Sequence, residues 1–274
     1  MPLSIWLVLI PQSLCMALVA AFFTGFGVGV LLLVRQFVHH SILKRHNDIA
    51  GFVFATVGVI YGVMLAFVVI IVWEQYNDAN TIARNEAAQA YSLYRDLSIY
   101  PDQKEAKPAI VSLEVFSKAV VEKEYPLLRQ MKWETKHVVS VDTEKKFLKL
   151  WNDIKTIAPK TLQEMAMFNE ILKDINTIGQ EREKRLIISH DDLPGVIWVT
   201  MVLGALVTIG FTSLFGNENP KGQIVITSLL SIVISLVIFV VISLNFPFTG
   251  EVAIGSEGYE HLIDTAGWGE KVHK

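Results

Sequence analysis

The sequence contains only one cysteine, Cys15, and it lies inside a long apolar run. A single cysteine excludes a disulfide within the chain and a zinc site built on several thiolates. Three of the seven histidines, His39, His40 and His46, fall in one short loop, but no carboxylate or cysteine is spaced to complete a metal site with them. We therefore expect no metal and no cofactor, and we assign these histidines an interfacial role.

Charge is missing from four long stretches, which contain no Asp, Glu, Lys, Arg or His although 19% of the residues are charged. Each stretch is long enough to cross a bilayer as a helix. The sequence therefore predicts an all-α membrane protein with four transmembrane helices. The expected parts are 1–73, holding spans at about 14–34 and 49–73 with a basic loop at 35–48; 74–193, a helical extramembrane domain; 194–245, the third and fourth spans; and 246–274, a glycine-rich acidic tail.

No charge of one sign is in large excess, since 24 basic residues face 27 acidic ones. The basic footprint of a nucleic-acid-binding protein is therefore absent. The sequence also offers no nucleophile and base pair, no phosphate loop and no paired carboxylates in an apolar setting, so we expect no enzyme. A secondary active transporter is disfavoured because the spans carry no ionisable residue and no repeat is evident.

One very long helical pattern is present instead, from Asp48 to Tyr100. Its first half is apolar up to Trp73, and its second half keeps small and apolar residues at helical spacing until Pro101. This pattern predicts a second span that continues into the extramembrane domain. A helix predicted over 160–188 should run antiparallel to that continuation, so that the domain is built partly from extensions of the spans.

Short patterns in the tail and in the spans predict local features. Val252–Ile254 is expected to form a short strand, and Ser256 to cap a helix that continues through Asp264. Thr24–Gly27 superficially resembles a potassium-channel filter, but its place in an unbroken span favours helix packing. Three serines of the fourth span either line a water path or bond within and between helices. They are Ser228, Ser231 and Ser235.

Small residues follow one face of the second span. This spacing lets another helix backbone approach closely in lipid. The helix-packing residues expected on that face are Gly51, Ala55, Gly58, Gly62 and Ala66. A matching stripe in the first span consists of Ala17, Ala21, Gly25 and Gly29, so we predict that the two spans pack together.

The other face of the second span carries Phe54, Tyr61 and Leu65, which are predicted to face lipid or a pore. Acidic residues stand at both ends of the span. Rings of acids at a pore mouth favour cations, so identical subunits around this helix would make a cation-preferring channel. A non-conducting scaffold or sensor is the alternative. The acidic candidates are Asp48 at one end and Glu74 and Asp78 at the other.

The loop at 35–48 carries Arg35, Lys44 and Arg45, and no Lys or Arg precedes it. Short basic loops stay in the cytoplasm. The charges therefore predict that the N-terminus, the 74–193 domain and the tail lie on the outer side of the membrane.

Several motifs resemble the bestrophin-like domain family of bacteria, whose function is unknown, and the likeness covers nearly the whole chain. It implies a four-helix protein of the bacterial inner membrane and an oligomeric ion channel like the true bestrophins. True bestrophins keep the region between spans two and three in the cytosol, opposite to the charge-based orientation. Family members often have Asp and then Arg or Asn before the final Pro-Phe, where this chain has Asn245 and Phe246. The motifs are His46–Gly51, Gly58–Tyr61, Leu65–Phe67, Trp73–Gln75 and Pro247–Glu251.

Overall fold

The structure is a computed structural model that describes residues 10–130 and 141–269. Within these residues the chain is helical and contains no strand. The strand expected at Val252–Ile254 is therefore wrong: the backbone turns there, and the Ile254 N–H donates to the Pro247 carbonyl at 2.8 Å. The chain forms two compact units, one from Met1–Tyr76 with Asp192–Phe246 and one from Asn77–Asp191 with Pro247–Lys274.

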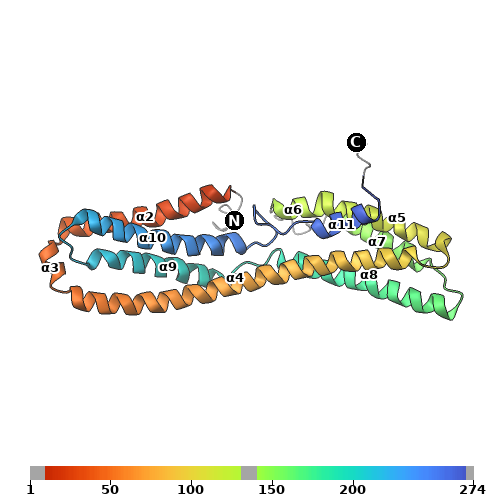
Figure 1. Cartoon of the computed structure of the whole chain (residues 1–274), viewed down its shortest axis with the longest axis horizontal. Helices are drawn as coiled ribbons and strands as arrows, with labels where there is room; N and C mark the ends of the chain where they lie inside the picture. The colour runs from red at the N-terminus through yellow and green to blue at the C-terminus, as the bar shows by residue number, and fades with distance from the viewer. Residues whose placement is uncertain (1–9, 131–140, 270–274) are drawn as a thin grey trace. The chain divides into compact units, whose positions relative to one another are not determined.

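Four helices of the described chain are long and apolar enough to cross a membrane, as the sequence predicted (Figure 1). Their length follows from uninterrupted apolar runs, in which lipid leaves the backbone no partner other than the helix itself. The third helix ends in a 3₁₀ turn, η2 (Thr212–Leu214). The four are α2 (Gln12–Phe37), α4 (Asn47–Ser98), α9 (Gly195–Phe211) and α10 (Pro220–Leu244).

In the first unit α2 packs against α10 and α9. The helices approach closely at Gly27, where an added Cβ would lie 2.6 Å from Ile209 and 3.0 Å from the Ser231 hydroxyl. The motif that contains Gly27 is thus part of an unbroken helix, and no re-entrant filter loop is formed there. No atom of the described chain lies within 4 Å of a Cβ built at Gly25 or Gly29, two residues of the predicted stripe. Helix α2 is therefore buried on the neighbouring side, which contains Gly27.

Hydroxyl groups of α10 bond to their own helix. Ser231 donates to the Thr227 carbonyl at 2.8 Å, and Ser235 to the Ser231 carbonyl. Both serines are buried within the chain. The sequence left open whether these serines line a water path or bond within and between helices. At Ser231 and Ser235 the structure shows bonding within the helix.

The loops at one end of the first unit are tied together by side chains. The short helix α3 (His40–Lys44) follows α2, and the Asn47 side chain then donates to and accepts from the backbone of Gly216 at 3.0 and 2.9 Å. Arg35 donates to the Asn217 carbonyl at 2.7 Å. The Asn47 side chain thus fastens the turn between the third and fourth spans.

The second unit contains the second half of α4 and the remaining described helices. A π-helical turn, η1 (Val120–Glu124), joins two of them without a break. The core consists of apolar side chains on α5, α7 and α8, including Phe116, Leu150 and Ile175. The other helices are α5 (Gln103–Ala119), α6 (Tyr125–Arg129), α7 (Val141–Lys155), α8 (Leu162–Ile188) and α11 (Glu257–Thr265).

Helices α4 and α8 run antiparallel in this unit, as predicted. Glu86 pairs with Arg185, whereas Gln89, further along α4, donates to Asp174, which comes earlier in α8. Two contacts in opposite chain order can form only between antiparallel helices.

The tail folds back onto the second unit and ends in α11. Gly258 sits against α4 so closely that an added Cβ would come 2.6 Å from the Ala87 Cβ. Thr249 donates to the Leu128 carbonyl at 3.1 Å. The helix after Ser256 was predicted, but the Ser256 hydroxyl bonds to the Glu260 carboxylate at 2.5 Å and makes no cap.

Candidate functional site

The membrane-spanning part of α4 buries one side within its own chain. Tyr61 and Leu65 are each only 6% exposed, and the Tyr61 hydroxyl donates to the Met201 carbonyl of α9 at 3.0 Å. Beside the tyrosine ring lies Gly204, where an added Cβ would come within 2.5 Å of the ring. Two of the residues expected to face lipid or a pore therefore fasten α4 to α9.

Phe54, the third residue of that face, is half-buried in an aromatic cluster. Its ring centroid lies 5.7 Å from that of Phe211 and 5.6 Å from that of Phe215. Aromatic pairs at such distances add to the stability gained by burying their surface. All three residues of this face are thus wholly or partly buried within one chain.

The opposite side of α4 is bare. Because successive residues turn by about 100° around a helix, Val59, Val63 and Ile70 lie opposite the Tyr61 side. They are 66%, 52% and 50% exposed. Glu74, four residues after Ile70, continues the same stripe and is also exposed. We call Val59, Val63, Ile70 and Glu74 the outer stripe of α4.

The small-residue face lies on the flank between these two sides. No atom stands within 4 Å of a Cβ built at Gly58 or Gly62, and Gly51 meets only the Phe215 ring, at 4.0 Å. Ala55 and Ala66 are exposed. These residues make no close helix contact inside the described chain, and contact through them requires a second molecule.

The acidic candidates are all at the surface. Asp48, Glu74 and Asp78 are exposed, and none of them forms an ion pair or hydrogen bond within the part of the chain that the structure describes. Within the described part of the chain, no group of three or more His, Cys, Asp or Glu residues could hold a metal ion.

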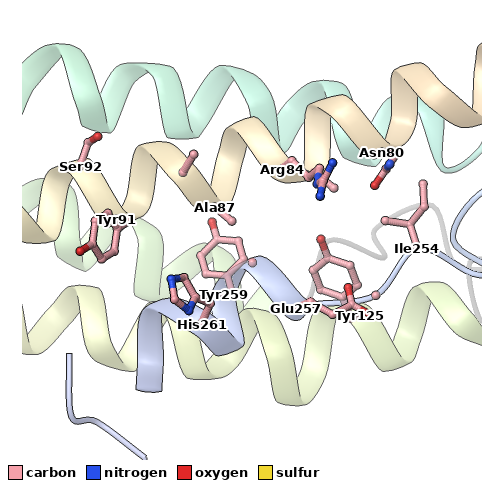
Figure 2. Close-up of a pocket in the computed structure, with 14 residues that line it drawn as sticks. Asn80, Arg84, Ala87, Tyr91, Ser92, Tyr125, Ile254, Glu257, Tyr259 and His261 are labelled. Carbon is pink, nitrogen blue, oxygen red and sulfur yellow. The ribbon is translucent and has the colours of Figure 1, made fainter. Parts of the chain in front are cut away.

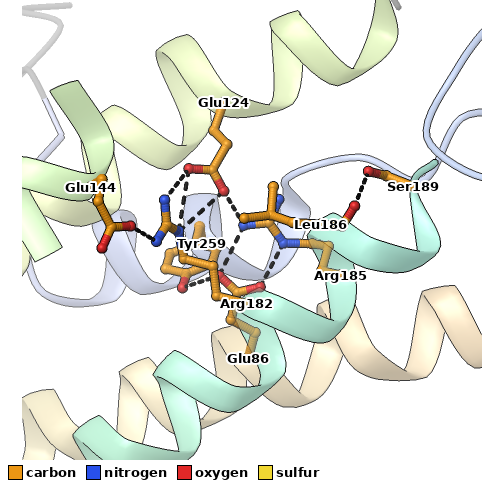
Figure 3. A network of polar contacts seen from close by, with 8 residues as sticks. All are labelled: Glu86, Glu124, Glu144, Arg182, Arg185, Leu186, Ser189 and Tyr259. Carbon is orange, nitrogen blue, oxygen red and sulfur yellow. Dashed lines mark hydrogen bonds and ion pairs between the residues drawn. The ribbon is translucent and has the colours of Figure 1, made fainter. Parts of the chain in front are cut away.

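The second unit holds a buried ion network that joins five elements (Figure 3). Arg185 of α8 donates to Glu86 of α4 and to Glu124 of η1, both at 2.5 Å. Arg182, one turn earlier, pairs with Glu124 at 2.9 Å and with Glu144 of α7 at 2.6 Å. The Tyr259 hydroxyl of α11 donates to Glu86 at 2.8 Å. The π-helical turn brings Glu124 into the network.

The charges of this network are fixed by one another. Burial disfavours the charged form of Glu124, but Arg185 and Arg182 outweigh burial and hold the pKa of Glu124 below its usual value. Burial raises the pKa of Tyr259 well above its usual value, and the neighbouring Glu86 raises it further. Glu86, Glu124 and Arg185 are at most 1% exposed, so each charge depends on its partner.

A separate carboxylate, Asp174 of α8, is buried without full pairing. One oxygen accepts from Gln89, while the other has no hydrogen-bond partner within the described chain. Burial, followed by the nearby charge of Asp96, raises the pKa of Asp174 to about 6. Asp174 therefore titrates near neutral pH.

An open groove of about 780 Å³ runs along α4 beside the start of α11 (Figure 2). One wall carries Asn80 and Arg84 of α4, and the other carries Tyr125 and Glu257. At one end the rings of Tyr91 and His261 stack at 6.3 Å. The volume is that of a small-molecule site.

Sequence reasoning found neither the ion network nor the groove. Arg182 and Arg185 are the buried arginines of α8. Their spacing continues the buried line of Ile171, Ile175 and Ile178 on α8, and two arginines on an apolar stripe signal a buried ion pair. The groove depends on the path of the tail, for which the sequence holds no comparable signal.

Comparisons with known proteins agree with this architecture. None of the curated proteins compared matches the chain. A bacterial bestrophin homologue from Klebsiella pneumoniae, in a single-substitution variant, has a TM-score of 0.69 at 12% identity, covering 90% of this chain and 98% of that chain. The structure of the same homologue phased with zinc has a TM-score of 0.66 at 11% identity, with the same coverage.

A family model described as the bestrophin-like domain matches residues 21–259, which include most of the first span, the other three spans and most of the second unit. The likeness noticed in the sequence motifs is confirmed by this match. The chain belongs to the bestrophin-like family.

Proposed function

We propose that the protein is a subunit of an oligomeric ion channel whose pore is lined by the outer stripe of α4. The observation that carries this proposal is the bare side of the longest membrane helix. Inside the chain α4 is fastened only through its Tyr61 side, which leaves the Val59, Val63 and Ile70 side free. The family resemblance supports the same function, and no feature of the described residues favours an enzyme.

The small-residue flank supports contact between subunits. Gly58 and Gly62 have open space beside them, and a neighbouring α4 could approach closely there. A ring built in this way would bury the flank and turn the outer stripe toward the axis. Hydrophobic constrictions of this kind gate by excluding water.

Acidic residues at the end of the outer stripe would set the preference for cations. Replacing Glu74→Gln together with Asp78→Asn is expected to lower cation selectivity, because the mouth loses its negative potential. Screening acts over about 8–10 Å at physiological salt, so the difference from the parent should be largest at low salt. Exposed charges contribute little to stability, and the variant should fold normally.

Reversal potentials under a salt gradient in planar bilayers measure this effect. If the parent conducts and the double variant shows the same selectivity, these acids do not set the selectivity. A folded parent that carries no current under any condition would favour the scaffold or sensor.

The orientation in the membrane is predicted from the loop charges. The loop with Arg35, Lys44 and Arg45 is expected on the cytoplasmic side, which places the second unit outside. A membrane-impermeant thiol reagent added to intact cells should therefore label Lys107→Cys and spare Ser41→Cys. The reverse labelling would show the cytosolic placement that the resemblance to true bestrophins implies.

A further inference from the structure

The groove beside α11 contains polar groups that have no partner in the described chain. Arg84 and Glu257 form no ion pair there, and the side chains of Asn80 and Tyr125 make no hydrogen bond to the described residues. Tyr125 is itself only 3% exposed, so its ring is fixed in the core while its hydroxyl end reaches the groove. Arg84 and Glu257 are exposed to solvent, and with Asn80 and the Tyr125 hydroxyl they offer a polar ligand four groups around one opening (Figure 2).

The two charges are opposite in sign and come from different elements. Arg84 projects from α4, whereas Glu257 begins α11. Gly255 makes room for the Glu257 carboxylate, which lies where a Cβ of residue 255 would stand. The two side chains face the same groove but do not meet, since no ion pair joins them. A ligand with one charge of each sign can satisfy both.

We propose that this groove binds a small zwitterion of the amino-acid type. Arg84 receives the ligand carboxylate as a charge-assisted hydrogen bond, with the Tyr125 hydroxyl as a second donor. Glu257 receives the ammonium group. The assignment goes beyond the proposed channel function and does not depend on it.

The remainder of the groove fits an apolar side chain. Ala83, Ala87 and Ile254 line it and are buried. The stacked rings of Tyr91 and His261, with an interplanar angle of 23°, offer an aromatic end. Aromatic rings prefer offset or edge contacts with further rings. L-phenylalanine is therefore a suitable probe.

Calorimetric titration of the full chain in detergent tests the proposal with three probes. L-phenylalanine carries both charges, 3-phenylpropionate only the carboxylate, and 2-phenylethylamine only the ammonium group. L-phenylalanine is expected to bind at least about tenfold more tightly than either of the others, as one lost charged hydrogen bond implies. Equal binding of all three, or binding of none, would overturn the proposal.

Variants assign each charge to its partner. Arg84→Gln should weaken the binding of L-phenylalanine about tenfold and leave the binding of 2-phenylethylamine unchanged. Glu257→Gln should also weaken the binding of L-phenylalanine about tenfold, but leave the binding of 3-phenylpropionate unchanged. The matched control is Arg95→Gln, an exposed arginine of α4 outside the groove. An equal loss in the control would contradict the assignment.

Discussion

Replacing Arg185→Met is expected to lower the free energy of unfolding by about 3–5 kcal/mol, which is typical when one partner of a buried ion pair is removed. The guanidinium is completely buried and serves both Glu86 and Glu124. Without it, two carboxylates with almost no exposure would have to stay charged without this partner or take up protons. Chemical denaturation in detergent, followed by circular dichroism, measures the loss.

Two further variants make this prediction specific. Arg95→Met removes an exposed arginine whose pair with Asp96 is at the surface, so its effect should stay below about 1 kcal/mol. The double variant Arg185→Met, Glu86→Gln removes the carboxylate that is left without an arginine, while Glu124 keeps its pair with Arg182, and should recover part of the loss. If Arg185→Met is no less stable than Arg95→Met, the network does not organise the second unit.

Lowering the pH from 7.5 to 5 is expected to stabilise the second unit through Asp174. The pKa of this carboxyl is raised from 3.8 to about 6, so the folded state binds the proton more tightly than the unfolded state. The resulting stability is present in full below the unfolded pKa and is lost as the pH rises through about 6. After solvent screening the difference amounts to about 1–2 kcal/mol.

Asp174→Asn should remove this pH dependence and raise the stability at pH 7.5, because the amide oxygen can still accept from Gln89. The nearby charges that remain are Asp96 on α4 and Glu170 and Lys173 on α8. Glu183→Gln, an exposed acid of the same helix, serves as the control and should keep the pH dependence of the parent. An Asp174→Asn variant with an unchanged pH slope would show that another group titrates.

The membrane helices could be predicted from the sequence because lipid imposes a simple rule. A backbone in hydrocarbon must satisfy its own hydrogen bonds, so an apolar run of sufficient length is a helix. Helical spacing of small and apolar residues, unbroken until Pro101, extended the predicted helix from Asp48 to Tyr100, close to the observed end of α4 at Ser98. The same kind of spacing predicted the long α8 and its antiparallel pairing with α4.

The orientation of α4 about its own axis could not be predicted in this way. In lipid an apolar side chain gains little by turning toward the protein interior. The pattern of Phe54, Tyr61 and Leu65 therefore does not show whether these residues face the protein or the lipid. The contact is decided by shape: the Tyr61 ring fits beside Gly204, on a helix distant in sequence. Glycine pairs such as Gly58 and Gly62 look identical whether they face a neighbouring helix or open space.

The buried network was missed for a different physical reason. Arg182 and Arg185 pair with carboxylates that lie 38 to 99 residues away in the sequence. The partner Glu124 reaches them through a π-helical turn, for which local sequence gives no clear signal. Spacing on a single helix shows that a charge will be buried, but it does not show which acid will meet it.

Conduction through cysteine variants of α4 tests the central proposal most directly. In a Cys15→Ala background, Val63→Cys lies on the outer stripe and Leu65→Cys on the side packed against α9. A charged thiol reagent should block the current of purified Val63→Cys protein in planar bilayers and leave that of Leu65→Cys unchanged. Block at Leu65→Cys with none at Val63→Cys, or no current from the folded parent oligomer, would contradict a pore lined by this stripe.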